Sequence, residues 1–187
     1  MCMSEGRLDL ARNDGQPLGR AYVQGSPDRR GGSYYVQGVM MLDKSKIGFE
    51  FASFTADVEK GRLRFFAKAI GETNPIYTDE AAAREAGYRA LVAPPTFTMV
   101  LDMEGPEFLP FLDLLNMDIA RILHGTQEFE YFAPICAGDS ITVTGHIADM
   151  FEKKGGALEF VVMEQSYTNQ DGELVAKSTN TLVHRNG

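Results

Sequence analysis

Hydrophobic and polar residues alternate near residue 50 and then change to helical spacing. From residue 46 to 56 large apolar side chains alternate with small or polar ones, which is typical of a strand buried on both faces. Behind Asp57, a candidate helix cap, apolar residues recur at three-four-three spacing as far as Ile70. This spacing predicts a helix ended by Gly71, and a second short helix is predicted from Asp79 to Ala86.

The second half of the chain begins with an apolar helical segment and continues as β structure. Residues 91–103 are apolar nearly all round after Pro94 and Pro95, which predicts a helix inside the core with a proline at its first position. Four strands in an antiparallel meander are expected next, at Gln127 to Phe132, Ile141 to Ala148, Leu158 to Tyr167 and Leu174 to Val183. The order predicts an α+β fold, a curved antiparallel sheet wrapped around a central apolar helix.

The N-terminal part differs in composition from the rest. Residues 1–33 contain little apolar material and end in a run of Gly, Ser, Pro, Asp and Arg, which predicts a flexible arm. The alternative is a docking segment, suggested by the apolar residues that follow it, Tyr34 to Val36. With residues 34–45 as a connecting segment, we expect one domain from 46 to 187.

Charge and cysteine content narrow the class of protein. Lys and Arg total 18 against 26 Asp and Glu, and a net charge of -8 makes nucleic acid an unsuitable partner. Cys2 and Cys136 cannot build a disulfide framework, and neither a secretory signal nor a run of eighteen apolar residues occurs, so we expect a cytoplasmic protein without a membrane span. Metal-ligand spacings and phosphate-binding glycine loops are lacking in the sequence, so no metal or cofactor is expected.

Several ordered blocks resemble the MaoC-like dehydratases and the R-specific enoyl-thioester hydratases. They lie at residues 65–80, 92–97 and 124–131, with Pro134 and Gly138-Asp139 behind them, so the resemblance covers about residues 46–185. It implies the hotdog fold and an acyl substrate linked to CoA or to an acyl-carrier protein. In active members, it further implies, an Asp two residues before an Asn-Pro pair and a His two residues after its Pro activate water.

Both positions of that pair differ in this chain, which has Glu72 and Tyr77 there. The extra methylene of Glu moves its oxygens by about 1 Å, and a misplacement of that size can cost about a hundredfold in rate. A phenol is neutral at pH 7 and accepts a proton poorly. Glu72 has the alternative role of a solvated turn carboxylate, and Tyr77 that of an ordinary half-buried aromatic residue.

A backbone donor that the resemblance implies is missing as well. The His-Gly pair of active relatives aligns with Ala93-Pro94, and proline has no amide hydrogen for the thioester oxygen. Loss of one such donor typically costs about a hundred- to a thousandfold in rate. Thr96, at the expected helix start, offers an amide that would shift the oxyanion site instead of removing it.

Tyr77 together with the run Ala-Pro-Pro-Thr-Phe at 93–97 resembles the fatty-acid-synthase-like dehydratase N-terminal domains. The chain is also similar to the non-catalytic subunit of heterodimeric 3-hydroxyacyl-carrier-protein dehydratases. This implies a substrate-binding subunit that needs a catalytic hotdog partner. Two alternatives stay open: a homodimeric hydratase that uses Glu72 with Tyr77 or His124, and a non-enzymatic acyl-thioester-binding module. A homodimer or heterodimer is expected, because one curved sheet leaves its edge strands unpaired.

The other candidates are substrate-binding residues, each with an ordinary structural role beside the functional one. Asn74 is expected mainly to hydrogen-bond its own turn, and Met99 to serve both as core and as acyl-chain wall. His146 and His184 are expected at the surface, without a chemical role. The substrate-binding candidates are Asn74, Ala93, Pro94, Thr96, Phe97 and Met99.

Overall fold

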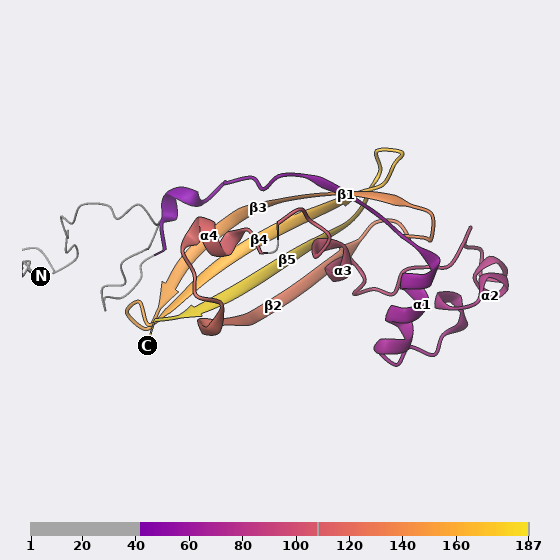
Figure 1. The fold of residues 1–187 in the computed structure, drawn as a ribbon, viewed down its shortest axis with the longest axis horizontal. Coiled ribbons are helices and arrows are strands. Elements are labelled where there is room, and N and C mark those ends of the chain that lie inside the picture. Colours follow the sequence, from indigo (N-terminus) through magenta and orange to yellow (C-terminus); the bar gives the residue numbers. More distant parts are fainter. Residues whose placement is uncertain (1–41, 108, 187) are drawn as a thin grey trace, which may run out of the picture. The chain divides into compact units, whose positions relative to one another are not determined.

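One antiparallel sheet is formed by β1 (Phe54–Asp57), β2 (Ile122–Tyr131), β3 (Ser140–Lys153), β4 (Leu158–Thr168) and β5 (Leu174–Arg185) (Figure 1). The computed structural model describes residues 42–107 and 109–186. The arm expected at 1–33 and most of the connecting segment at 34–45 lie outside these residues, so both stay predictions. Each of the five predicted strands has a counterpart, and the α+β class is confirmed.

The strand order is β1-β3-β4-β5-β2, so the predicted meander is right for β3, β4 and β5 and wrong for β2. β2 pairs with β5 at the edge of the sheet, because residues 132–139 carry the chain across to the far side of β4. Three strand spacings measure about 14 Å, well within the reach of these residues. Ala137 donates to Leu91 O at 2.8 Å on the way, which ties the crossing to the helical half of the chain.

The helices of the first half follow the sequence pattern closely. α1 (Lys60–Ala69) is followed by Gly71 at a φ of 72°, which is the predicted end. α2 (Glu80–Glu85) begins at Asp79, whose carboxylate accepts from two backbone amides, as the sequence predicts. The cap predicted for α1 is wrong: Asp57 lies in β1 and accepts a hydrogen bond from Ser140 Oγ at 2.9 Å.

The central helix is much shorter than predicted. Its helical part is α3 (Thr98–Asp102), so both prolines precede the helix and neither takes its first position. α3 ends at Asp102, and residues 103–107 form turns and bends. After residues 103–110 a second short helix, α4 (Phe111–Leu115), continues across the sheet (Figure 1). The helix predicted within residues 91–103 is therefore confirmed only for α3, and α4 is a helix that the sequence pattern did not predict.

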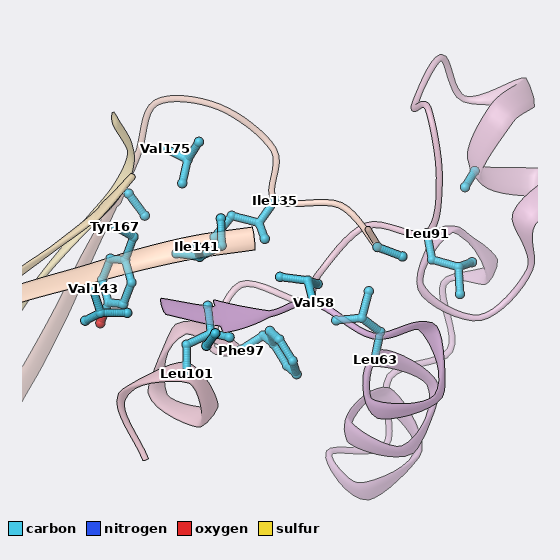
Figure 2. Packing of buried hydrophobic residues seen from close by; sticks show 14 residues of the cluster. Val58, Leu63, Leu91, Phe97, Leu101, Ile135, Ile141, Val143, Tyr167 and Val175 are labelled. Atoms are coloured by element: carbon cyan, nitrogen blue, oxygen red, sulfur yellow. The ribbon is translucent and has the colours of Figure 1, made fainter. Parts of the chain in front are cut away.

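The hydrophobic core holds both helices against the same face of the sheet. Phe97, Leu101, Val143 and Tyr167 belong to one buried cluster, in which Figure 2 shows Val143 beside Tyr167, its partner in the β3–β4 register. A second cluster packs α4 against the other half of the strands; its members include Phe111, Leu115, Ile147, Met150, Val161, Met163 and Leu182. The amphipathic strands thus bury one face under α3 and α4.

A β-bulge at Gly125 changes which residues of β2 face α3 and α4. The pairing with β5 shifts between His124 and Thr126, and a bulge of one extra residue reverses the alternation of faces. His124 and Gln127, three residues apart, consequently line the same cavity. Glycine fits here because an added Cβ would lie 2.9 Å from Thr181 O.

We expect Gly125→Ala to destabilise the protein by about 1–3 kcal/mol, because the new methyl group would overlap backbone that cannot move aside. Gly61→Ala is the matched control: Gly61 lies in α1 with open space around it, and Ala there should stabilise by about 0.5–1 kcal/mol. Urea unfolding followed by circular dichroism measures both. An unchanged midpoint for Gly125→Ala would contradict the tight approach of β2 and β5.

Candidate functional site

The turn that carries the family motif is closed by its own side chains. Glu72 Oε1 accepts hydrogen bonds from the amides of Thr73 and Asn74, both at 2.8 Å. Asn74 Oδ1 accepts from Ile76 N at 3.1 Å, and Pro75 begins the short 3-10 helix Pro75–Tyr77. The local role expected for Asn74 is therefore confirmed, and one carboxylate oxygen of Glu72 is engaged in holding the turn.

Tyr77 is half-buried beside this carboxylate. Burial raises the pKa of its phenol above the ordinary value near 10, and the negative charge of Glu72 and the phenol of Tyr88 raise it further. At neutral pH the hydroxyl keeps its proton, so it can donate a hydrogen bond or orient a water molecule. It cannot act as a general base at that pH.

A cavity of about 690 Å³ lies elsewhere, between the sheet and the segment that contains α3 and α4. Of the residues singled out in the sequence, Met99 and His124 line it. The other candidates are not among its lining residues; they are Glu72, Asn74, Tyr77, Ala93, Pro94, Thr96 and Phe97.

The residues at 93–97 hold the entry to α3. Ala93 N donates to Ile135 O at 2.8 Å, and Pro94 is buried. Phe97 is completely buried, with its ring edge-on to Phe66 at 5.5 Å between centroids. Thr96 is exposed. Phe97 thus supports α3 by packing, Ala93 fixes the preceding segment through its backbone, and among the α3 candidates Met99 lines the cavity.

Asp102, at the end of α3, is a cavity residue that the sequence reasoning missed. Its carboxylate accepts from the Tyr167 hydroxyl, at 2.7 Å to Oδ1 and 2.9 Å to Oδ2. Burial raises the pKa of Asp102 from 3.8 to about 6, against the opposing effect of the Tyr167 hydrogen bond. The sequence feature that could have indicated Asp102 is its position as the one acidic residue in the largely apolar run at 91–103.

The hydrogen-bond network continues from Asp102 into the sheet. Ser178 Oγ lies 3.0 Å from the Tyr167 hydroxyl and 2.8 Å from Gln165 Oε1. Burial and the adjacent carboxylate raise the pKa of Tyr167 far above its usual range, so this phenol stays protonated. Asp102 and Gln165 both line the cavity, as do Gln127 and Asn180.

Apolar side chains make up much of the remaining cavity wall. They include Phe49, Phe51, Phe54, Met99, Leu109, Phe111, Leu114, Ile122, Val143, Met163 and Leu182. A wall of this kind with a few convergent polar groups is typical of a small-molecule site. The cavity can therefore accommodate an elongated apolar group and offer hydrogen bonds to polar atoms on it.

The surface position expected for His184 is wrong. It is 2% exposed in β5, not at the surface, and its Nδ1 lies 3.0 Å from Asn186 Oδ1. Buried Glu159 on β4 accepts from Leu42 N at 2.6 Å and from Asn186 Nδ2 at 2.8 Å. This buried polar group ties the first described residue to the end of the sheet, and it lies outside the cavity lining. His146 is exposed on β3, as expected.

Asp139, in the Gly-Asp block, is also buried. It forms an ion pair with Arg89, and its Oδ2 accepts from Cys136 N at 2.7 Å. The Gln170 amide donates to Oδ1 at 3.2 Å. These contacts fasten the crossing loop at 132–139, so the block positions the sheet and does not line the cavity.

Residues 42–107 and 109–186 contain neither a cluster of metal-ligating side chains nor a helix that could span a membrane. Within those ranges, His, Cys, Asp and Glu side chains do not gather in any group of three or more that could hold a metal ion. In the same part of the chain, none of the helices has the length and apolar character needed to cross a membrane.

The fold and the cavity together define a hotdog protein of the MaoC-like dehydratase type. The chain belongs to the family of FAS1-like dehydratase domain regions, whose model matches residues 45–178. It is 36% identical to a UPF0336 protein of Saccharopolyspora erythraea over 78% of this chain and 93% of that protein.

Solved structures agree with this assignment. The HadBC (3R-hydroxyacyl-ACP dehydratase) complex of Mycobacterium tuberculosis contains a chain with 31% identity and a TM-score of 0.63, covering 74% of this chain and 96% of that one. A MaoC-like dehydratase has 24% identity and a TM-score of 0.69, covering 76% of this chain and 43% of that one. The predicted hotdog fold and family resemblance are both confirmed.

Asp102 should make stability depend on pH. Its pKa is higher in the folded protein, so the folded state holds the proton more tightly and loses stability as pH rises from about 4 through 6. We expect Asp102→Asn to be more stable than the parent protein by about 1–3 kcal/mol at pH 8, with a difference that shrinks towards pH 4. Denaturant unfolding at several pH values measures this.

Asp113→Asn serves as the control, since Asp113 also lines the cavity but is exposed on α4. Asp113→Asn should change the free energy of unfolding only slightly at every pH. A constant difference between Asp102→Asn and the parent from pH 4 to 8 would show that the carboxylate ionises as freely in the folded state as in the unfolded one.

Proposed function

We propose that this protein is the substrate-binding subunit of a 3-hydroxyacyl-thioester dehydratase, or of the reverse enoyl hydratase, and that a hotdog partner supplies the catalytic Asp and His. The observation that carries the proposal is the apolar cavity of about 690 Å³, which lies apart from the motif turn. The substrate would be an acyl chain linked to CoA or to an acyl-carrier protein. The HadBC structure, titled a (3R)-hydroxyacyl-ACP dehydratase complex, supports this class of substrate.

The cavity suits an acyl chain in size and in lining. Small-molecule sites commonly measure about 300–1,000 Å³, and each buried methylene contributes about 0.8 kcal/mol. Met99 and Met163 lie on opposite sides, one from α3 and one from β4. Their flexible side chains can adapt to chains of different length.

The motif turn lacks the groups that hydration requires. Glu72 holds two backbone amides through Oε1, and Tyr77 keeps its proton at neutral pH. Pro94 has no amide hydrogen to stabilise an enolate oxygen. Base placement, proton transfer and oxyanion stabilisation would therefore have to come from another subunit.

Edge strand β2 is the proposed contact with that subunit. It has β5 on one side, and among the described residues no strand pairs with its other side. Apolar side chains are exposed along and just beyond it; they are Leu123, Tyr131 and Phe132. Pairing with a second hotdog would satisfy the free backbone groups and cover these side chains.

We expect the purified chain to scatter light as a dimer, or as a heterodimer when a partner hotdog is present. Leu123→Arg should weaken either assembly about tenfold or more, because it places a charge on an apolar contact surface. Ile47→Arg is the matched control: Ile47 is 41% exposed against 49% for Leu123, and its segment runs beside β3 on the other side of the sheet. A monomer that ignores every hotdog partner would contradict the proposed edge contact.

The catalytic proposal is tested by loss of enoyl absorbance with crotonyl-CoA and trans-2-decenoyl-CoA. The chain alone should turn over near background, and a hotdog partner with Asp and His should restore activity by about a hundredfold or more. Glu72→Gln in that mixture should keep the rate within about twofold, since here the residue supports only the turn.

Other outcomes separate the alternatives. Robust turnover by the chain alone that Glu72→Gln abolishes would establish the homodimeric hydratase. The cavity position of His124 favours one variant of that enzyme, in which turnover survives Glu72→Gln and fails in His124→Ala. Binding of acyl-CoA without turnover in any mixture would establish the non-enzymatic binding module.

A further inference from the structure

Three polar residues from separate elements line the same cavity. Asp102 ends α3, Gln165 lies on β4 and Asn180 on β5. In the β4–β5 register Gln165 faces Ser178 and Met163 faces Asn180, so Gln165 and Asn180 are diagonal neighbours on one face. Gln127 on β2 stands directly opposite Asn180. The cavity is otherwise largely apolar, and we call four of its polar residues, Asp102, Gln127, Gln165 and Asn180, the polar wall.

Two residues of the polar wall, Asp102 and Asn180, have acceptor oxygens with an incomplete set of hydrogen bonds. Both oxygens of Asp102 share the single proton of the Tyr167 hydroxyl. Asn180 Oδ1 is buried and has no hydrogen-bond partner within residues 42–107 and 109–186. Across the same residues, none of the ion pairs formed by Lys, Arg or His involves Asp102.

Without a ligand, this arrangement lowers the stability of the folded protein. A buried acceptor without a donor destabilises the folded protein, and a half-buried carboxylate without a countercharge, such as that of Asp102, adds to this. Tyr167, Ser178 and Gln165 would already satisfy one another without Asp102. Asn180 Oδ1 lacks a donor, and Asp102 has only the proton of Tyr167 for its two oxygens. The cavity that both residues line is where a ligand would bring a further donor.

We propose that Asp102, Asn180 and Gln165 form a subsite that selects acyl thioesters with a hydroxyl farther along the acyl chain than the 3-hydroxyl of the proposed reaction. The proposal rests on the proposed function and adds a substrate class to it. A hydroxyl suits the site because it donates to a carboxylate or amide oxygen and accepts from an amide nitrogen. A ketone or an ether cannot donate, so neither would satisfy Asp102 or Asn180. A plain alkyl chain would leave Asn180 Oδ1 unpaired and would bring no further donor to Asp102.

The test is calorimetric titration of the full chain with decanoyl-CoA and with its 6-, 8- and 10-hydroxy and 10-oxo derivatives. At least one hydroxy isomer should bind about tenfold more tightly than decanoyl-CoA, the size of effect expected for a hydrogen bond to a charged group. The oxo derivative should show no such gain. The position of the preferred hydroxyl would report how far along the chain the polar wall lies.

Asp102→Leu should abolish the preference for a hydroxyl and leave decanoyl-CoA binding equal or tighter. Asn180→Leu should reduce the preference independently, so the test survives if Asp102→Leu does not fold. Asp113→Leu is the control: it alters an exposed carboxylate of the same cavity and should keep the preference.

The outcomes separate this inference from the function on which it rests. If no acyl-CoA binds to the chain, the proposed function fails. If decanoyl-CoA binds and no hydroxy isomer gains, the hydroxyl subsite alone is overturned. If Asp102→Leu weakens the binding of every thioester equally, the groups that donate to Asp102 are the amides of CoA, which all these ligands share. Selection by the acyl group is then overturned as well.

Discussion

The burial of Phe97 and Leu101 against the sheet is the interaction on which the cavity depends. Both side chains are fully buried among strand residues such as Val143 and Tyr167, and each contributes about 1.5–3 kcal/mol. A helix as short as α3 has no stability of its own in water. Packing therefore sets its position, and with it the positions of Met99 and Asp102 on the remaining sides of the helix.

The family motifs keep the fold in place more than they serve the cavity. Glu72 and Asn74 close their turn, Asp139 fastens the crossing loop to Arg89, and Phe97 anchors α3. Each of these contacts is local or lies in the core. A chain can therefore have these blocks, and the hotdog fold that they support, without a catalytic pair. The resemblance therefore identified the fold, whereas the site residues that it implies stay predictions.

The sequence predicted what depends on neighbours along the chain. Helix ends at Gly71 and Asp79 and the positions of the long strands follow from local pattern and were confirmed. The place of β2 beside β5 was not predictable from the pattern, because pairing between distant strands leaves no mark in either strand. Burial of Asp102 and His184 depends likewise on side chains far away in the sequence. Residues 91–103 suggested one long helix because periodicity reports an apolar environment more reliably than helix length.

The bulge at Gly125 has a consequence for comparing this protein with its relatives. β2 behaves as two half-strands of opposite parity, with His124 on one side of the glycine and Gln127 on the other, both facing the cavity. A relative that lacks the extra residue would present the other set of side chains over half of this wall. Its cavity would then differ in chemistry although every aligned residue were identical. To compare the specificity of such proteins, one must therefore first count the residues between His124-Gly125, or their equivalents, and the end of this strand.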